Sequence, residues 1–478
     1  MTRAALAGLL TAAVLAPASS AALSPDARSA AEKAAPSPNV LVIMTDDQTV
    51  ESLRVMRNVR RLLGDRGTSF SNSFVTYALC CPSRATFLTG QYAHNHGVLG
   101  NKPPIGGYAR LDHTNTLPVW LQDAGYYTAH LGKYLNGYGR TSPTEVPPGY
   151  DEWRGSVDPS TYRFYDYTLN ENGRLTTYGE YQTDVYARKA ARIIQRRAPR
   201  ARPFFLWVAF LAPHGGGPRE PGDPGRLPSP VPAPRHRNDF ASEPLPRPPG
   251  FNEADVSDKP ARIRNRPLLT RSGIRDIREM YQQRLESLLA VDEAVARMVA
   301  ALRRARELDN TLIVFTSDNG FFHGEHRVPA GKVLPYEPSI RVPLIMRGPG
   351  IPARRRLGHR VANIDLAPTI VDAAGATPGR VMDGRSLLSI IANPQTTLGR
   401  DLLVERGPGA GTFTAVRTPN YLYAEYGNDD RELYDLIRDP FQLESRHADP
   451  AYAALRDDLA ERLAHLRACS GPSCRTRP

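Results

Sequence analysis

Three short apolar runs constrain the fold of this 478-residue chain more than any other feature of its sequence. They cover residues 39–44, 204–211 and 311–316, and β-branched and large apolar side chains dominate each of them. Continuous runs of this length are typical of strands that are buried on both faces, as in a parallel sheet covered by helices. The sequence therefore predicts an α/β fold around a mostly parallel sheet.

Polar residues follow each apolar run directly. They are Asp46 and Asp47 after the first run, His214 after the second, and Asp318 and Asn319 after the third. In open α/β sheets, ligands gather at the carboxyl ends of the strands. We therefore expect three distant segments to deliver these polar side chains to one site.

The two acidic pairs offer only oxygen ligands. One Asp-Asp pair at a strand end is usually a turn or a helix cap. Two such pairs after two buried strands, Asp46-Asp47 and Asp318-Asn319, favour a metal site instead. An all-oxygen set suits calcium or magnesium and does not suit zinc.

Residues 80–90, C-C-P-S-R-A-T-F-L-T-G, form the most specific motif in the chain. Alone, a cysteine pair is most often inert core packing, and a proline here is typical of an ordinary turn. The C-x-P-S-R spacing from Cys80 to Arg84, with Leu-Thr-Gly behind it, resembles the formylglycine signature of the type I sulfatases. The resemblance implies that a maturation enzyme oxidises Cys80 to Cα-formylglycine, and that Cys81 fills a variable position.

The chemistry of sulfate ester cleavage explains why an aldehyde hydrate is useful as the nucleophile. Covalent catalysis divides one hard step into two easier ones only if the intermediate can be broken again. In a geminal diol one hydroxyl attacks sulfur, and the second then loses a proton to expel sulfate and restore the aldehyde. Serine and cysteine have no second hydroxyl. Arg84 is expected to hold the hydrate through charge-assisted hydrogen bonds.

The same resemblance assigns the remaining site residues. The positions that match the family's metal ligands are Asp46, Asp47, Cys80 as its hydrate, Asp318 and Asn319. The positions that match its sulfate contacts are Lys133, His214 and Lys332. The cation would polarise the sulfate and activate the attacking hydroxyl, whose proton Asp318 is the candidate to take. His214 is the candidate for protonating the leaving oxygen.

One position departs from the family pattern. Many sulfatases have a histidine two residues after the first lysine, where it helps to eliminate sulfate, whereas this chain has Leu135. Residues 132–138 and 92–96 are instead similar to N-acetylglucosamine-6-sulfatases and to extracellular heparan 6-O-endosulfatases. Candidates for a replacement base are Asn136, His323 and His326. For His94 and His96 the sequence is compatible with either a structural or a catalytic role.

The N-terminal residues 1–22 predict a Sec-type secretory signal peptide. Arg3 precedes an apolar run over residues 4–16, and small residues follow at 19–22. The run is too short to span a membrane, so we expect a secreted or periplasmic protein without stable membrane insertion.

The other two cysteines, Cys469 and Cys474, flank a Ser-Gly-Pro-Ser turn near the C-terminus. In an exported chain this spacing predicts a small disulfide loop. Zinc is the rival interpretation, but no further histidine or cysteine pair is placed to complete four ligands. The disulfide leaves Cys80 and Cys81 as the unpaired cysteines.

The formal net charge of +12 and the pI of about 9.6 suit an anionic partner. The longest basic tract is only residues 354–356, and no nucleic-acid-binding signature is present. Nucleic acid is therefore not expected, and a polyanionic sulfated substrate fits the charge.

A chain of 478 residues is longer than a single hydrophobic core usually supports. After the signal peptide over 1–22 we therefore expect two parts, a catalytic domain over 37–390 and a C-terminal subdomain over 391–478. Residues 274–308 predict a long amphipathic helix. Residues 213–260 are dense in proline and glycine and predict a surface excursion beside the substrate entrance.

The resemblance covers residues 39–439 and implies the alkaline-phosphatase-like sulfatase fold, a large mixed, mostly parallel sheet flanked by helices with a smaller C-terminal antiparallel sheet. It implies a sulfuric ester hydrolase that acts on 6-O-sulfated N-acetylglucosamine or related sulfated carbohydrates, as in glycosaminoglycan degradation, and on aryl sulfates. Two alternatives stay open. One is a phosphoester or phosphonate hydrolase of the same superfamily; the other is a non-catalytic sulfated-glycan binding protein, if Cys80 is unmodified.

Overall fold

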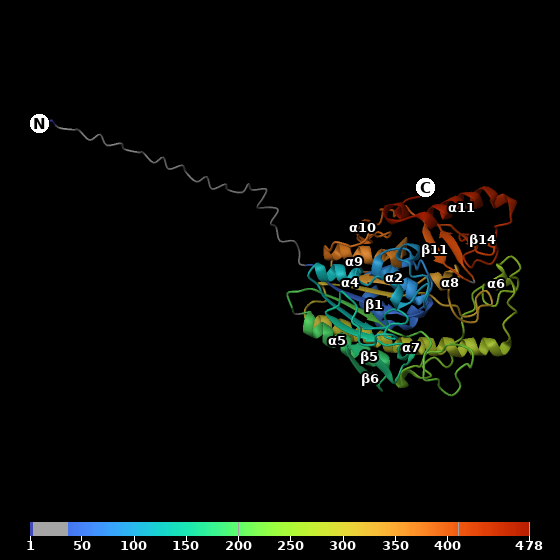
Figure 1. Ribbon diagram of the computed structural model, residues 1–478. Helices are drawn as coiled ribbons and strands as arrows, with labels where there is room; N and C mark the ends of the chain where they lie inside the picture. The colour runs from blue at the N-terminus through green and yellow to red at the C-terminus, as the bar shows by residue number, and fades with distance from the viewer. Residues whose placement is uncertain (3–36, 199, 410, 478) are drawn as a thin grey trace. The chain divides into compact units, whose positions relative to one another are not determined.

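The three apolar runs are neighbouring strands in the computed structural model (Figure 1). β1 (Asn39–Thr45) lies between β7 (Phe204–Ala209) and β8 (Thr311–Ser317) and is parallel to both. Met44 pairs with Ala209 on one side and with Thr316 on the other, so the three strands end at the same edge. The predicted parallel centre of the sheet is confirmed.

The structure describes residues 1–2, 37–198, 200–409 and 411–477, and within these ranges ten strands form the main sheet in the order β10-β2-β9-β8-β1-β7-β3-β4-β5-β6. The further strands are β2 (Thr68–Phe74), β3 (Tyr127–Gly132), β4 (Glu152–Ser156), β5 (Tyr167–Glu171), β6 (Arg174–Tyr178), β9 (Leu344–Arg347) and β10 (Arg355–Ala362). β9 is antiparallel to β2 and β8, and β5 to β4 and β6, so the sheet is mixed. The predicted signal peptide, residues 1–22, lies outside the described ranges except for its first two residues.

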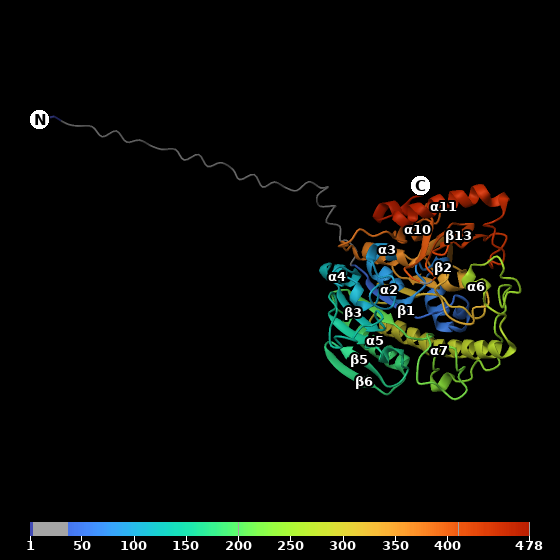
Figure 2. The same ribbon diagram turned by 45° about the vertical axis from the view of Figure 1, so that its right-hand side comes forward.

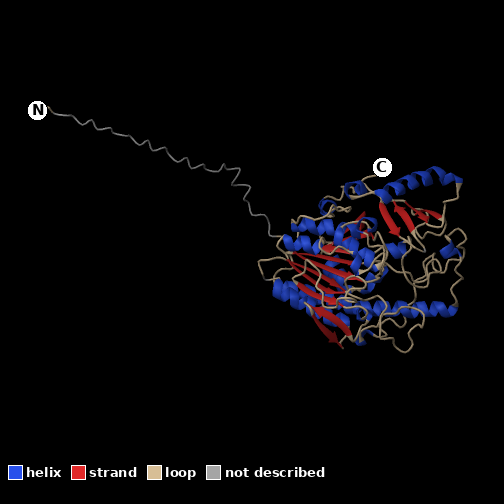
Figure 3. Cartoon of the chain, viewed as in Figure 1, coloured by secondary structure: helices blue, strands red, loops and turns tan. Residues whose placement is uncertain are grey.

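Helices cover both faces of the main sheet (Figure 3). On one face Leu41 and Ile43 of β1 join a core with α5 (Gln182–Arg197) and α7 (Arg271–Arg304). On the other face Val40 and Val42 join a core with α2 (Cys80–Thr89), α4 (Leu117–Asp123) and α9 (Leu366–Ala374). Alternate residues of one strand therefore enter different cores, which explains why β1 is apolar throughout.

The C-terminal part forms a second, smaller sheet. Its antiparallel strands are β11 (Leu402–Arg406), β12 (Phe413–Arg417), β13 (Tyr421–Tyr426) and β14 (Arg431–Asp435). α11 (Ala453–Ala468) lies along this sheet (Figure 2), and the predicted Cys469–Cys474 disulfide is formed just after it. The predicted fold class, a large mixed sheet with a small C-terminal antiparallel sheet, is confirmed.

The remaining elements are short. The α-helices are α3 (Ala93–His96), α6 (Ala261–Arg264), α8 (Glu337–Ile340) and α10 (Leu388–Ala392). The single turns are η1 (Glu51–Val55), η2 (Val59–Gly64), η3 (Tyr108–Arg110), η4 (Ser160–Tyr162), η5 (Pro234–His236), η6 (Asn363–Asp365), η7 (Pro450–Tyr452) and η8 (Gly471–Arg475). Between residues 213 and 260 the structure has only η5, as expected for an irregular excursion. No helix in the described part of the chain is long and apolar enough to cross a membrane.

Candidate active site

Four neighbouring strands, β8, β1, β7 and β3, end at the edge where the predicted site residues lie. The residues that follow these strands are Asp318 and Asn319, Asp46 and Asp47, His214, and Lys133. α2 begins at the same edge with Cys80, and Arg84 lies one turn further along this helix. The structure therefore brings these residues, which are far apart in the sequence, to one edge of the sheet.

Arg84 joins three of the converging segments and is fully buried. Its Nε donates to Asp318 Oδ2 at 2.8 Å, and its Nη2 donates to Asp46 Oδ2 at 3.1 Å. Its Nη1 donates to the carbonyl oxygen of Lys133 at 2.6 Å. In the unmodified chain the guanidinium group therefore holds the ends of β1, β3 and β8 together.

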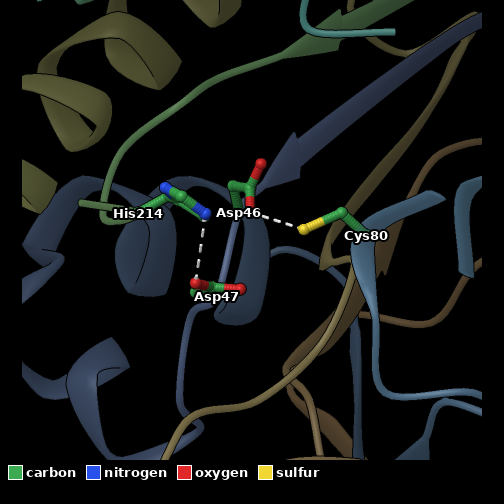
Figure 4. Close-up of side chains that lie close together, drawn as sticks. All are labelled: Asp46, Asp47, Cys80 and His214. Atoms are coloured by element: carbon green, nitrogen blue, oxygen red, sulfur yellow. Dashed lines mark hydrogen bonds and ion pairs between the residues drawn. The ribbon is translucent and has the colours of Figure 1, made fainter. Parts of the chain in front are cut away.

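Cys80 lies among charged groups (Figure 4). Its Sγ is 3.6 Å from Asp46 Oδ1 and accepts a hydrogen bond from Lys332 Nζ at 3.3 Å. Lys332 also pairs with Asp47 Oδ1, and His214 Nε2 lies 3.8 Å from Asp47 Oδ2. One ligand atom from each of Asp46, Asp47, Cys80 and His214 fits within a group whose members are all within 4.8 Å of one another.

Asn319 supports a cation site in this place. Its Nδ2 donates to Asp47 Oδ1 at 2.6 Å, whereas its Oδ1 is buried and has no hydrogen-bond partner among the described residues. A buried carbonyl oxygen without a donor is costly unless something else satisfies it, and a cation does so. With the carboxylates of Asp46 and Asp47 beside it, the donor set fits a hard divalent cation.

The three buried carboxyls differ in pKa. Burial opposes the ionisation of Asp46, but the charge of Lys133 and those of its other cationic neighbours outweigh it and lower the pKa. Burial likewise opposes ionisation of Asp47, and Lys332 lowers its pKa. Burial and the negative charge of Asp46 raise the pKa of Asp318 to about 6. Asp318 is therefore the carboxyl best suited to take up a proton near neutral pH.

His214 and Cys80 are uncharged in this environment. Burial lowers the pKa of His214 to about 4, and its Nδ1 donates to the carbonyl oxygen of Gly215 at 2.6 Å. Its Nε2 then carries no proton, so His214 must first gain one before it can protonate a leaving group. Burial and the charge of Asp46 raise the pKa of the Cys80 thiol to about 12, so the unmodified side chain is a thiol at neutral pH.

Arg284 of α7 is a site residue that the sequence did not reveal. Its Nη1 donates to the carbonyl oxygen of Pro213 at 2.9 Å, its Nη2 donates to that of Asp47, and its guanidinium carbon lies 3.9 Å from the centre of the Phe321 ring. It therefore fixes the backbone behind Asp47. Arg284 is one of many arginines in an amphipathic helix, and no local signal separates it from the others.

Leu135 stands where many sulfatases have a histidine, and it is buried in the core beside α2. The neighbouring Asn136 lies closer to the site, because its Nδ2 donates to Tyr162 Oη at 2.6 Å and the Tyr162 ring lies 4.7 Å from Lys133 Nζ. His326 is bound to Glu253 by a 2.6 Å contact. His323 is buried, and its Nε2 has no partner among the described residues.

His94 and His96 have structural contacts. His94 Nδ1 lies 3.1 Å from Glu405 Oε2, and its Nε2 lies 3.0 Å from the carbonyl oxygen of Cys469. His96 bonds to Thr86 Oγ1 at 3.1 Å and accepts from the Val98 backbone N–H, also at 3.1 Å. Both rings fix loops around α2 and α3.

The family model described as Sulfatase matches residues 38–376, which is more than half of the chain. The chain belongs to the sulfatase family. A second model, described as N-sulphoglucosamine sulphohydrolase, C-terminal, matches residues 324–469. This sulfatase is thus a sulfuric ester hydrolase, as the C-x-P-S-R motif predicted.

Known proteins resemble this sulfatase along most of its length. The human N-acetylglucosamine-6-sulfatase is 34% identical over 493 residues, which cover 92% of this chain and 86% of the human protein. An extracellular sulfatase Sulf-1 homolog of Caenorhabditis elegans is 38% identical over 365 residues, which cover 74% of this chain but only 49% of that protein. A solved structure of a protein in complex with its substrate D-glucosamine-2-N,6-O-disulfate has a TM-score of 0.78 and 25% identity, and covers 90% of this chain and 97% of that chain.

Proposed function

We propose that this sulfatase removes 6-O-sulfate from N-acetylglucosamine or a related sulfated carbohydrate, and that it also cleaves aryl sulfates. The similarity to the human N-acetylglucosamine-6-sulfatase over 92% of the chain carries this proposal. Leu135, in place of the histidine of many sulfatases, fits the same subgroup.

The proposed nucleophile is the hydrate of a Cα-formylglycine formed from Cys80. The contacts of Cys80 Sγ with Asp46 Oδ1 and Lys332 Nζ support this proposal, because a hydrate formed from this side chain would lie among the same groups. The hydrate, once formed, would supply a hydroxyl that attacks sulfur and a second one that allows release. A maturation enzyme is the partner that this chemistry requires.

We assign the cation to Asp46, Asp47, Asp318 and Asn319 together with the Cys80-derived group, and we favour calcium over magnesium. When bound, it would polarise the sulfate oxygens and acidify the nucleophile. The buried Oδ1 of Asn319 is the observation that supports this set. His214 Nε2, which lies near Asp47, is a further candidate contact.

The chain's own cationic groups would bind the sulfate. Lys332 Nζ contacts Cys80 Sγ, and Lys133 pairs with the neighbouring Asp46, which supports the proposal that both ammonium groups bind sulfate oxygens. Asp318 would accept the proton of the nucleophile. A protonated His214 would donate to the leaving oxygen. Arg84 would hold Asp46 and Asp318 in place during the reaction.

Peptide mass spectrometry around Cys80, combined with turnover of a chromogenic aryl sulfate, tests the mechanism. Protein made beside a maturation enzyme should lose the thiol mass in favour of the aldehyde or its hydrate, and activity should disappear in Cys80→Ala. An unmodified thiol and no turnover in such protein would favour the glycan-binding alternative. Competition between paired sulfate and phosphate esters separates a sulfatase from a phosphoester hydrolase.

Positional isomers test the substrate class. The 6-O-sulfate of N-acetylglucosamine should be released at least about tenfold faster than the 3-O-sulfate or the 4-O-sulfate of a hexosamine, a factor that a few directed hydrogen bonds supply. Equal rates on all isomers would leave the sulfatase activity standing and refute the 6-O preference. N-terminal sequencing of exported protein tests the proposed removal of residues 1–22.

A further inference from the structure

Two arginines lie close together beside the small sheet and lack acidic partners. Arg262 belongs to α6, and Arg406 is the last residue of β11. A Cβ atom at Gly411 would clash with Nη1 of both arginines, so the two guanidinium groups face the same small space. Among the described residues neither side chain has a hydrogen-bond or ion-pair partner, and Nη1 of Arg406 is buried without one.

This arrangement is unfavourable without an anion. Two positive groups at short range repel each other, and a buried N–H group without an acceptor costs free energy. Burial and the charge of Arg262 lower the pKa of Arg406, which reflects the same repulsion. A carboxylate or sulfate between the two planar guanidinium groups would remove both costs, because each group can donate two parallel hydrogen bonds to such an anion.

The arginine pair lines a cavity of about 830 Å³. Pockets for small-molecule ligands fall in this size range. Asp430 also lines the cavity, but its carboxylate accepts from the backbone N–H of Ala261 at 2.7 Å and from Asn428 Nδ2 at 2.8 Å. Both bonds go to Oδ2 of Asp430, and its Oδ1 lies 3.9 Å from Arg264 Nη2. In the described part of the chain no carboxylate forms an ion pair with Arg262 or Arg406, so the arginine pair is left for a ligand.

The backbone places this cavity beside the segment that leads to the nucleophile. Glu405 N donates to the carbonyl oxygen of Thr76 at 2.8 Å, and Tyr77 Oη accepts from Gly407 N at 3.3 Å. Tyr77 lies three residues before Cys80, so their Cα atoms are at most about 11 Å apart. Arg406 therefore lies on a strand that is hydrogen-bonded directly to the segment that carries Cys80.

We propose that Arg262 and Arg406 form a second anion subsite, which binds a carboxylate or sulfate on a sugar next to the one that loses its sulfate. The inference rests on the proposed function, action on a sulfated carbohydrate. It specifies the substrate further: an oligosaccharide with regularly spaced anionic groups binds better than a monosulfated monosaccharide or an aryl sulfate, neither of which reaches the subsite.

Steady-state kinetics of Arg262→Gln and Arg406→Gln test this subsite with four substrates. These are an aryl sulfate, 6-O-sulfated N-acetylglucosamine, a disaccharide that links this sugar to a uronic acid, and a disaccharide that links it to a second sulfated hexosamine. Each variant should raise KM about tenfold for one or both disaccharides, since a charge-assisted hydrogen bond is lost. The two disaccharides distinguish a carboxylate from a sulfate as the bound anion. Activity on the aryl sulfate and the monosaccharide should stay unchanged.

Control variants keep the test specific. Arg406→Lys retains the charge without the planar fork and should give a smaller rise in KM. Arg356→Gln removes an exposed arginine on β10 and should change nothing. If Arg262→Gln and Arg406→Gln leave KM for both disaccharides unchanged, the subsite does not exist.

Binding to inactive protein separates this inference from the proposed function. Calorimetry of the two disaccharides with Cys80→Ala should show about tenfold weaker binding when Arg406→Gln is added. That result supports the subsite even if the wild-type protein fails to release sulfate from these sugars. Equal affinity for both disaccharides, with and without Arg406→Gln, overturns it.

Discussion

At the scale of single residues, Arg84 shows how a site can be held together by one buried side chain. It bonds to Asp46 and Asp318, and all three side chains are fully buried. Arg84→Ala should lower the free energy of unfolding by about 3–5 kcal/mol, because it leaves the buried Asp318 carboxylate without an ion-pair partner and removes one of the two partners of Asp46. Urea unfolding, followed by circular dichroism, measures this loss.

The exposed pair of Arg188 and Glu180 gives the matched control for Arg84. Arg188→Ala removes the same charge from the surface and should cost no more than about 1 kcal/mol. Equal losses for the two variants would show that Arg84 does not carry the buried network. Arg84→Lys should not rescue stability, since an ammonium group cannot bridge both carboxylates in the same way.

His94 predicts a pH-dependent contribution to stability. Both ring nitrogens face acceptors, Glu405 and the carbonyl oxygen of Cys469, so only the protonated ring satisfies both. Burial opposes this charge, but Glu405 outweighs it and raises the pKa above 6.5. The contribution is therefore complete below pH 6.5 and is lost as the pH rises through the folded-state pKa.

Thermal unfolding of His94→Gln at two pH values tests whether the stabilising contribution of His94 is lost as the pH rises. The variant should lose more stability relative to the parent at about pH 5.5 than at about pH 8.5. A larger loss at the higher pH would mean that His94 is held neutral. His96, whose pKa burial lowers to about 3, is the comparison: the unfolded chain protonates this ring below about pH 6.5 and the folded chain does not, so His96→Gln should show the opposite trend, with the smaller loss at the lower pH.

At the scale of elements, the N-cap of α7 allows us to predict how much one capping side chain contributes to the stability of a 34-residue helix. Thr270 Oγ1 accepts from the backbone N–H of Gly273 at 3.1 Å and is the side-chain cap of this helix. Thr270→Ala should cost about 1 kcal/mol. Hydrogen exchange of the amides in the first turn of α7 should therefore be faster in Thr270→Ala. Thr270→Ser retains the cap and is the control. Equal exchange in the two variants would contradict a capping role for Thr270.

The sequence was sufficient to predict the strands that are buried on both faces along their whole length. β1, β7 and β8 are buried on both faces, so their apolar runs were visible, and the residues after them could be placed at one edge. β6 (Arg174–Tyr178) has no buried residue and pairs only at the sheet margin, so nothing in its polar sequence distinguished it from a loop. Arg284 and the Arg262–Arg406 pair could not be found either, because periodicity locates a helix face but not the distant backbone or side chain that meets it.

At the scale of the whole molecule, the proposed subdomain 391–478 does not have a core of its own. Phe74 and Ile340 of the large part lie in the same apolar core as Leu403 and Val416 of the small sheet. A chain that ends at residue 390 should therefore expose this core, bind a hydrophobic dye and lack a cooperative unfolding transition. A cooperatively folded, dye-free fragment would show that residues 37–390 are an independent domain.

The burial of Cys80 bears on whether this residue can be oxidised before or after the chain folds. Only 1% of the residue is exposed, and its Sγ contacts both Asp46, before it in the chain, and Lys332, which is 252 residues further along. An enzyme that oxidises Cys80 must therefore reach it before the sheet closes, while the chain is being made or exported. If Cys80 is converted to formylglycine as proposed, the active fraction is decided by a competition between two rates, folding and oxidation. Slower folding should yield more active molecules, and adding the maturation enzyme after folding should yield none.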